Sequence, residues 1–562
     1  MKYNNTFVHG KIIILLFISL CLFSRSNAQV NFPLNHQWAE IIEKDLNDTS
    51  NWAHTSFRPF IYQQVQKSIN LDSIYGQFKR EKTAHLLGKT WWSKALIWAD
   101  KAIFDESVIS IAKDGCLIKI NPLMDLAYGT TVGGKNITTT NTRGFSIEGK
   151  IGSKLFFTSS FLESQSKFLP YVKDFIVANN GVVPGQGRSK SFKTNQGYDY
   201  GRAAGLVSYS PSKYFNFQLG HDKIFIGDGY RSLLLSDNGF NQPLIKITTK
   251  FWHIEYVNLF TQFQQVGFIG QLDALIPKKY GNFHYLSWNV TKRWNISLFE
   301  AIISAASNNR MYEFQYLNPV IFLRPVEFAN GSGDNALMGA TSKIKLGHNT
   351  ILYGQILLDE FNIQKLKEAP GWWGNKFGVQ LGLKAFDLFT IKNLNLQLEA
   401  NVVRPYTYSH YGDSATAKYS SSNFTTYNQS LAHPLGANFA EGLAFLNYHK
   451  KRFFFESRVS YALYGADSAG INYGQNVNLS YNYNRAKISG DLGDFGHTIG
   501  QGIQNTLLYT DLKVAYLINP STNLRIEFGW MTRQQVSSII NSNVSYLYFG
   551  MRCALFNHNY DF

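Results

Sequence analysis

Apolar and polar residues alternate with a period of two along most of the chain. In the segment 394–402 every even position is apolar and every odd position is polar, and the segment 524–530 repeats the arrangement with Arg525 and Glu527 on its polar face. Successive side chains of a strand point to opposite faces, so each segment predicts a strand with one apolar face. One such strand could also lie at the edge of a soluble sandwich. Repetition of the pattern over roughly 440 residues instead favours a closed membrane barrel, apolar outside and polar inside.

Short links and long segments alternate between the predicted strands. The short links fall at 152–153, 211–212, 248–250, 291–293, 347–348, 390–393, 449–451 and 519–521. The long segments are 129–142, 164–198, 222–243, 264–281, 306–334, 361–371, 404–438, 464–502 and 533–542. Short periplasmic turns and long outer loops are typical of bacterial outer-membrane barrels. The sequence therefore predicts an all-β transmembrane fold, an antiparallel outer-membrane β-barrel of about 18 strands, with two strands more or fewer allowed.

The chain ends in another alternating segment, from Val544 to Phe562, with an aromatic residue at the last position. We expect this segment to be the closing strand of the barrel, paired with the strand that begins near Cys116. In that register Arg552 faces the lumen and Cys553 faces the lipid.

The first 113 residues differ from the rest. Residues 1–28 predict a cleaved signal peptide, with Lys2 and Lys11 before an apolar core and a small-residue cleavage site at 26–28. Apolar residues then recur at helical spacing in three patches, 34–46, 61–69 and 91–102. The sequence thus predicts a helical periplasmic region at 29–113, which plugs or buttresses a barrel at 114–562. The alternative is a flexible periplasmic extension with isolated helices.

Composition agrees with export to an outer membrane. Aromatic residues make up 15% of the chain and charged residues 16%, while the mean hydropathy is −0.18. The formal net charge is +16, and it falls to +13 once the three basic residues of the signal are removed. A basic surface suits anionic partners such as acidic polysaccharide or lipopolysaccharide phosphates, although it could also be a generic basic surface. Nucleic acid is not an expected partner for an exported protein.

No enzymatic or metal-binding motif stands out. Residues 129–136 nearly spell a phosphate-binding loop, but Asn136 replaces the hydroxyl residue that would hold magnesium, so a glycine-rich outer loop is favoured. Neither a nucleophile elbow nor a histidine pair with metal spacing occurs in the sequence. After signal removal two cysteines remain, Cys116 and Cys553, and both are expected to be inert thiols. We therefore expect no enzyme activity, no cofactor and no metal.

Three loop segments carry candidate binding residues. The segment 220–238 combines glycines with polar side chains that could hydrogen-bond sugars or pair with carboxylates: His221, Asp222, Lys223, Asp228, Tyr230 and Arg231. The segment 310–327 is too apolar for a freely solvated loop, and we expect it to fold into the lumen or over the mouth. Trp372 and Trp373 could stack on sugar rings. The alternatives are a structural role at the mouth for the first segment and an interfacial aromatic girdle for the tryptophans.

Three runs of residues resemble a known family. HDKIFIGDGYRSLLLSDN (221–238), YEFQYLNPVIFLRPVEF (312–328) and YFGMRCALFNHNYDF (548–562) resemble the Wzi-like capsule-assembly outer-membrane barrels in their Bacteroidetes form, some members of which are described as gliding-motility proteins of the RemB type. The resemblance implies an eighteen-stranded barrel with periplasmic helices. It also implies a non-enzymatic role in attaching or organising extracellular polysaccharide. It assigns no ligand residue in this chain.

The leading hypothesis is an outer-membrane barrel that binds acidic surface polysaccharide through its outer loops, with a link to gliding motility. Its expected surroundings are outer-membrane lipid and a partner in the periplasm or in the motility or secretion machinery. The alternative is a diffusion porin or nutrient channel, because eighteen strands leave room for an aqueous lumen. A surface hydrolase is the third hypothesis.

Overall fold

The structure is a computed structural model that describes residues 31–78, 80, 91–134, 136–192, 196–268, 276–305, 312–329, 333–412, 414 and 416–562. The predicted signal peptide lies outside the described residues. Among the described helices, none is long and apolar enough to cross a membrane.

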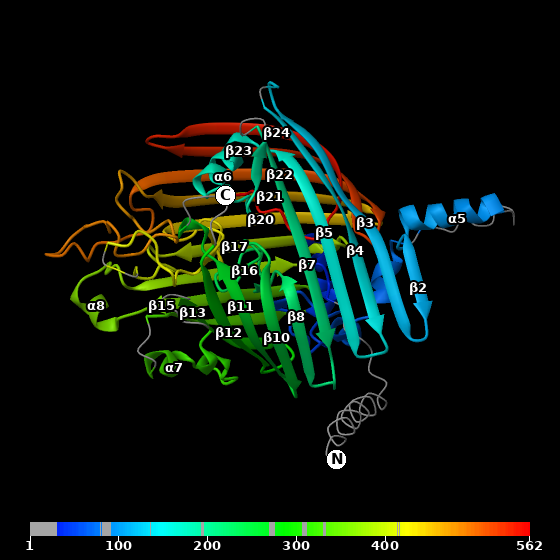
Figure 1. Cartoon of the computed structure of the whole chain (residues 1–562), viewed down its shortest axis with the longest axis horizontal. Coiled ribbons are helices and arrows are strands. Elements are labelled where there is room, and N and C mark those ends of the chain that lie inside the picture. The colour runs from blue at the N-terminus through cyan, green and yellow to red at the C-terminus, as the bar shows by residue number, and fades with distance from the viewer. Residues whose placement is uncertain are drawn as a thin grey trace, which may run out of the picture.

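Within the described residues, eighteen antiparallel strands close into a barrel (Figure 1), which confirms the predicted fold class and strand number. The last strand of the wall, β24, pairs with the first, β3, from Tyr546 opposite Thr131 to Arg552 opposite Asp125. The wall strands are β3 (Cys116–Thr131), β4 (Ile137–Ile151), β5 (Leu155–Lys167), β7 (Gly197–Tyr209), β8 (Phe215–Asp222), β10 (Gln242–Phe251), β11 (Ile254–Gln264), β12 (Lys278–Asn289), β13 (Trp294–Ala305), β14 (Asn335–Leu346), β15 (Thr350–Glu360), β16 (Lys376–Ala385), β17 (Leu394–Val403), β20 (Phe439–Lys450), β21 (Phe453–Ala466), β22 (Ile503–Asn519), β23 (Leu524–Ser537) and β24 (Asn541–Cys553).

Six shorter strands and several short helices accompany the wall, and two of these strands, β1 (Phe57–Arg58) and β9 (Phe225–Ile226), belong to the interior. The strand β2 (Ile109–Lys113) extends β3, and β6 (Lys190–Phe192) pairs with β7. The strands β18 (Thr425–Thr426) and β19 (Gln429–Ser430) form a small hairpin within a loop. The short loop helices are α7 (Arg324–Ala329), α8 (Ile363–Glu368), η2 (Val266–Phe268), η3 (Phe314–Leu317) and η4 (Leu388–Thr390).

The wall has the alternation that the sequence predicts. On β23, Phe528 is 54% exposed on the outer surface, whereas Arg525 and Glu527 are buried on the inner side. Because a strand sends successive side chains to opposite faces, one face of each such strand meets lipid and the other meets the lumen.

The two ends of the barrel differ. Short turns gather at one end, as between β4 and β5, while long loops such as 404–438 and 467–502 gather at the other. We call these the short-turn end and the long-loop end. The long loops and α8 project to the left in Figure 1, and the helix α5 (Trp91–Phe104) projects to the right. Short turns of bacterial outer-membrane barrels face the periplasm.

Three of the N-terminal helices lie in the predicted helical patches, and a further one, α4 (Leu71–Gly76), was not predicted. The three are α2 (His36–Leu46), α3 (Tyr62–Ser68) and α5. Asn35 caps α2 by accepting a hydrogen bond from the backbone N–H of Trp38. The apolar face of α2 packs against Phe454 and Leu517, which lie on β21 and β22 beside the short turns. This helix therefore sits inside the short-turn end of the barrel.

Three segments from different parts of the chain lie in the lumen, and we call them together the plug. They are residues 31–60, the loop 223–241 and the C-terminal tail 554–562. The first two pair directly, because β1 (Phe57–Arg58) runs antiparallel to β9 (Phe225–Ile226). Leu233, Leu234 and Leu235 are fully buried and pack against inward side chains of β11 to β14. Burial of this apolar surface holds the plug against one side of the lumen.

The C-terminal tail corrects one prediction. The strand predicted over 544–562 ends at Cys553, and the nine residues after it leave the sheet and enter the lumen. Cys553 is buried beside Leu123 and Leu162 and does not face lipid. The tail departs because the carboxylate of Asp561 finds arginine partners inside the lumen, whereas lipid would offer it none.

The apolar segment 312–329 also lies elsewhere than expected. Glu300 is on the outward face of β13, since its neighbours Phe299 and Ala301 belong to the lumenal core. Its carboxylate accepts hydrogen bonds from the backbone N–H groups of Phe322 (2.7 Å) and Arg324 (3.1 Å). The segment therefore packs against the outside of the wall and not in the lumen. The segment packs there because the buried carboxylate of Glu300 requires hydrogen-bond donors, and the backbone of the segment supplies them.

Candidate functional site

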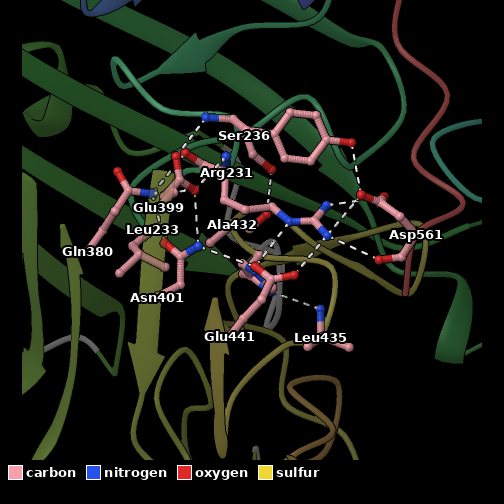
Figure 2. Close-up of polar contacts among 12 residues, drawn as sticks. Arg231, Leu233, Ser236, Gln380, Glu399, Asn401, Ala432, Leu435, Glu441 and Asp561 are labelled. Carbon is pink, nitrogen blue, oxygen red and sulfur yellow. Dashed lines mark hydrogen bonds and ion pairs between the residues drawn. The ribbon is translucent and has the colours of Figure 1, made fainter. Parts of the chain in front are cut away.

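Arg231, from the plug loop, is the centre of a buried hydrogen-bonded network (Figure 2). Its guanidinium lies 3.0 Å from the carboxylate of Glu441 on β20 and 3.1 Å from that of Asp561 in the tail. Its backbone N–H donates to Glu399 on β17 at 3.1 Å, and its carbonyl accepts from Gln380 on β16 at 3.0 Å. One residue thus joins the plug loop to the C-terminal tail and to three strands of the wall.

A second arginine completes the network. Arg458, on β21, donates to the Asp561 carboxylate at 3.0 Å, and the Tyr230 hydroxyl donates to the same carboxylate at 2.9 Å. Burial alone would raise the pKa of Asp561, but the guanidiniums of Arg231 and Arg458 hold it below its ordinary value. His433 lies 2.7 Å from Glu441 on the other side. The charges therefore satisfy one another, and the network holds the plug in place.

The remaining predicted residues of this segment are also committed to protein contacts. His221 and Asp222 end β8, where Asp222 lies 3.4 Å from Arg202. The Lys223 ammonium donates to the carbonyls of Gly185 and Asp237, and burial lowers its pKa to about 7. Asp228 accepts from the hydroxyls of Thr55 and Ser56 in the N-terminal segment and lies 3.3 Å from Lys343.

This segment is therefore not an exposed outer loop, and its role in ligand binding stays a prediction. The structure places Lys223, Asp228 and Arg231 inside the barrel, each 5% exposed or less. One apolar run, 224–226, lies between Lys223 and Asp228 and another, 233–235, follows Arg231, and burial of both runs draws the loop inward. The observed contacts agree with the alternative interpretation, in which the segment 220–238 has a structural role.

The tryptophan pair lies at the long-loop end. Trp373 packs against Tyr481 with ring centroids 4.8 Å apart, and the Arg485 guanidinium lies over its ring at 4.0 Å. Tyr406 makes an edge-to-face contact with Trp373, and Trp372 lies beside it at 5.7 Å. We call these five residues the Trp373 cluster. They come from three long loops, so the structure brings together residues that are more than 100 positions apart.

Hydrogen bonds hold the Trp373 cluster in place, and part of the cluster is exposed to solvent. The backbone N–H of Trp373 donates to the Asp494 carbonyl at 3.0 Å, and Arg404 donates to the Trp372 carbonyl at 3.2 Å. Arg485 pairs with the Asp494 carboxylate at 2.6 Å. Tyr406 is buried, whereas both tryptophans, Tyr481 and Arg485 are half-buried. The arrangement offers aromatic faces beside a cation, which is the chemistry that a sugar acid requires.

Sequence reasoning found the tryptophans but missed their partners. Tyr406, Tyr481 and Arg485 lie in loops without a local motif, and only the fold brings them together. It also missed Glu441 and Asp561 as partners of Arg231. The only available signal was charge, because a buried arginine requires a counter-ion and both residues are acidic.

No family model and no curated protein matches the chain. The barrel is similar to that of Wzi, described as an outer membrane protein involved in group 1 capsule assembly in Escherichia coli and a carbohydrate-binding β-barrel. The likeness covers 93% of this chain and 99% of that one, with 11% identity and a TM-score of 0.53. It extends more weakly to Pseudomonas aeruginosa OprD, over 77% of this chain and 94% of that one, with 12% identity and a TM-score of 0.39. For Acinetobacter baumannii OccAB2 the coverage is 77% and 96%, the identity 9% and the TM-score 0.41. At these identities, the likeness to Wzi shows that the chain shares the fold of an outer-membrane barrel.

Proposed function

We propose that this protein is an outer-membrane barrel that binds extracellular polysaccharide at the cell surface, and that it does so without enzymatic turnover. The observation that carries the proposal is the half-exposed Trp373 cluster at the long-loop end, beyond a lumen that the plug occupies. The description of Wzi as carbohydrate-binding supports the same role. The role of the loop 220–239 is then to hold the plug and not to contact the polymer.

The Trp373 cluster suggests how the polymer binds. A sugar ring stacks its C–H face on Trp373 or Tyr481, because aromatic rings bury large apolar surfaces at little cost in side-chain freedom. A sugar carboxylate competes with Asp494 for the Arg485 guanidinium, whose side chain is about one-fifth exposed. An acidic polysaccharide therefore fits the cluster better than a neutral one. The phosphates of lipopolysaccharide offer the same anionic chemistry.

The plug argues for binding over diffusion. An open eighteen-stranded barrel has room for an aqueous channel, yet here the segments 31–60, 223–241 and 554–562 occupy the lumen. The diffusion porin remains the alternative, and it requires the plug to leave.

The wider cellular role follows from location. The predicted signal peptide and the fold favour the outer membrane, with the short-turn end and α5 in the periplasm, where a partner in the motility or secretion machinery would bind. We propose a contribution to capsule organisation and, through it, to gliding. A deletion strain scored for surface polysaccharide and for spreading tests this: loss of both is expected, and retention of both would contradict the role.

Replacing Trp373 and Tyr481 together with alanine should weaken binding of a purified acidic polysaccharide at least tenfold. A loss of about 1.4 kcal/mol of stacking corresponds to this factor. The measurement is binding of detergent-solubilised protein to immobilised polygalacturonate. Trp252→Ala is the matched control, because Trp252 is an exposed tryptophan at the opposite, short-turn end. Equal binding by all three proteins would show that the Trp373 cluster is not the site.

A further inference from the structure

A cavity of about 270 Å³, lined by both polar and apolar side chains, lies in the lumen between the plug and the wall strands β3, β4, β16, β17 and β20 to β24. We call it the chamber. At its short-turn end it is lined by α2 residues such as Glu40, and at its long-loop end by Leu169, Tyr171 and Val172. The last two belong to the helix α6 (Pro170–Ala178), which therefore caps the chamber at the outer end.

Several charges of the chamber wall are paired with one another. Lys513 lies 2.9 Å from Glu456, and Arg458 lies 3.3 Å from Asp511. A charged solute would have to separate such a pair, and leaving a buried ion without its partner is costly. A neutral solute with many hydroxyl groups would not separate these pairs. Its hydroxyls can donate hydrogen bonds to the free lone pairs of the carboxylates and accept hydrogen bonds from the lysines and arginines.

Tyrosines supply the rest of the lining. Tyr509, Tyr546, Tyr548 and Tyr560 all reach the chamber, and a phenol offers both a flat apolar face and a hydroxyl. Pockets that hold drug-sized ligands measure about 300–1,000 Å³, so the chamber suits a smaller solute. Apolar faces beside hydroxyls and amides are the surface on which a sugar of one or two rings stacks and hydrogen-bonds.

The C-terminal tail holds the cap closed. The Tyr171 hydroxyl donates to the carbonyl of Tyr560 at 2.8 Å, and the Phe562 ring packs against Phe175 with centroids 4.9 Å apart. Arg533 lies over the Tyr171 ring at 4.4 Å. At the other end, a cavity of about 20 Å³ beside Glu40 leads toward the short turns, and it has room for about one water molecule. On the outer side, Tyr171 and Val172 of α6 line the chamber.

We propose that the chamber is a binding compartment for a small neutral sugar, and that α6, latched by the C-terminal tail, gates its outer entrance. This site is separate from the Trp373 cluster, so it does not depend on the proposed binding of surface polysaccharide.

Cysteine accessibility tests both parts of the proposal. Thr140 lines the chamber, so Thr140→Cys is introduced into full-length protein in which Cys116 and Cys553 are replaced by alanine, and its reaction with a small water-soluble maleimide is timed. Labelling should be slow, and Phe175→Ala should accelerate it at least tenfold by releasing the latch. Val177→Ala is the matched control, since Val177 is exposed on the same helix, and it should leave the rate unchanged.

Ligand protection then identifies the solute. In the Phe175→Ala protein, millimolar maltose should slow labelling of Thr140→Cys several-fold, and glucuronate or lysine should not. Thr139→Cys, on the opposite face of β4, should respond to none of them. Tyr171→Phe, which removes one hydroxyl, gives a second latch variant if Phe175→Ala fails to fold. An unchanged rate in both latch variants would overturn the gate, and absent protection by maltose, or equal protection by glucuronate, would overturn the assignment of a neutral sugar.

Discussion

Replacing Arg231 with methionine should release the plug and open the lumen while the barrel wall still assembles. The substitution leaves the carboxylates of Glu441 and Asp561 without the guanidinium that now lies within 3.1 Å of each. Removing one partner of a buried ion pair typically costs about 3–5 kcal/mol. Backbone hydrogen bonds between neighbouring strands hold the wall together. The lost free energy therefore destabilises the plug and leaves the wall folded.

The measurement is single-channel conductance in planar bilayers, together with heat-modifiable mobility to report the folded wall. Arg231→Met should give steady open currents that the parent protein lacks. Arg293→Met serves as the matched control, because Arg293 is an exposed arginine in a short turn. If Arg231→Met remains as closed as the parent, the network does not hold the plug.

Deleting residues 557–562 should also open the lumen, and the barrel wall should again remain folded. The wall strand β24 ends at Cys553, so the deletion removes no ladder hydrogen bond. It does remove the Asp561 carboxylate that Arg231 and Arg458 share, and the Phe562 carbonyl that accepts from Arg533 at 3.0 Å. Leaving several buried arginines partly unpaired should destabilise the plug at least as much as the single substitution.

Limited proteolysis in detergent reports this second change directly. The truncated protein should be cut within the loop 223–241, whereas the intact protein should resist. Asp561→Asn keeps the shape of the tail and removes only its charge, so it should give an intermediate effect. Failure of the truncated protein to form a heat-modifiable barrel would restore the interpretation of the tail as part of the closing strand.

The barrel itself could be predicted from the sequence because its determinants are local. Alternation at 394–402 and 524–530 and the turn residues between strands specify strand, face and order without long-range information. The turn between β10 and β11 shows the limit of such reasoning. It lies at Trp252–His253, beyond the predicted 248–250, because Trp252 adopts a left-handed conformation that nothing in its residue type suggests.

The contents of the lumen could not be predicted in the same way. Arg231 meets Asp561 across 330 positions, and Trp373 meets Tyr481 across 108, so neither contact leaves a local pattern. The polar residues 221–231 suggested a ligand site, yet the same hydrogen-bonding capacity serves the interior of the barrel. A buried network and a binding loop have similar compositions, and only burial distinguishes them.

The conductance of the unmodified protein shows directly whether the plug closes this barrel and leaves binding to its outer loops. In a planar bilayer, insertion should produce little or no steady current. A large, stable, ohmic current on insertion would show that the plug does not close the barrel, and it would favour the diffusion channel.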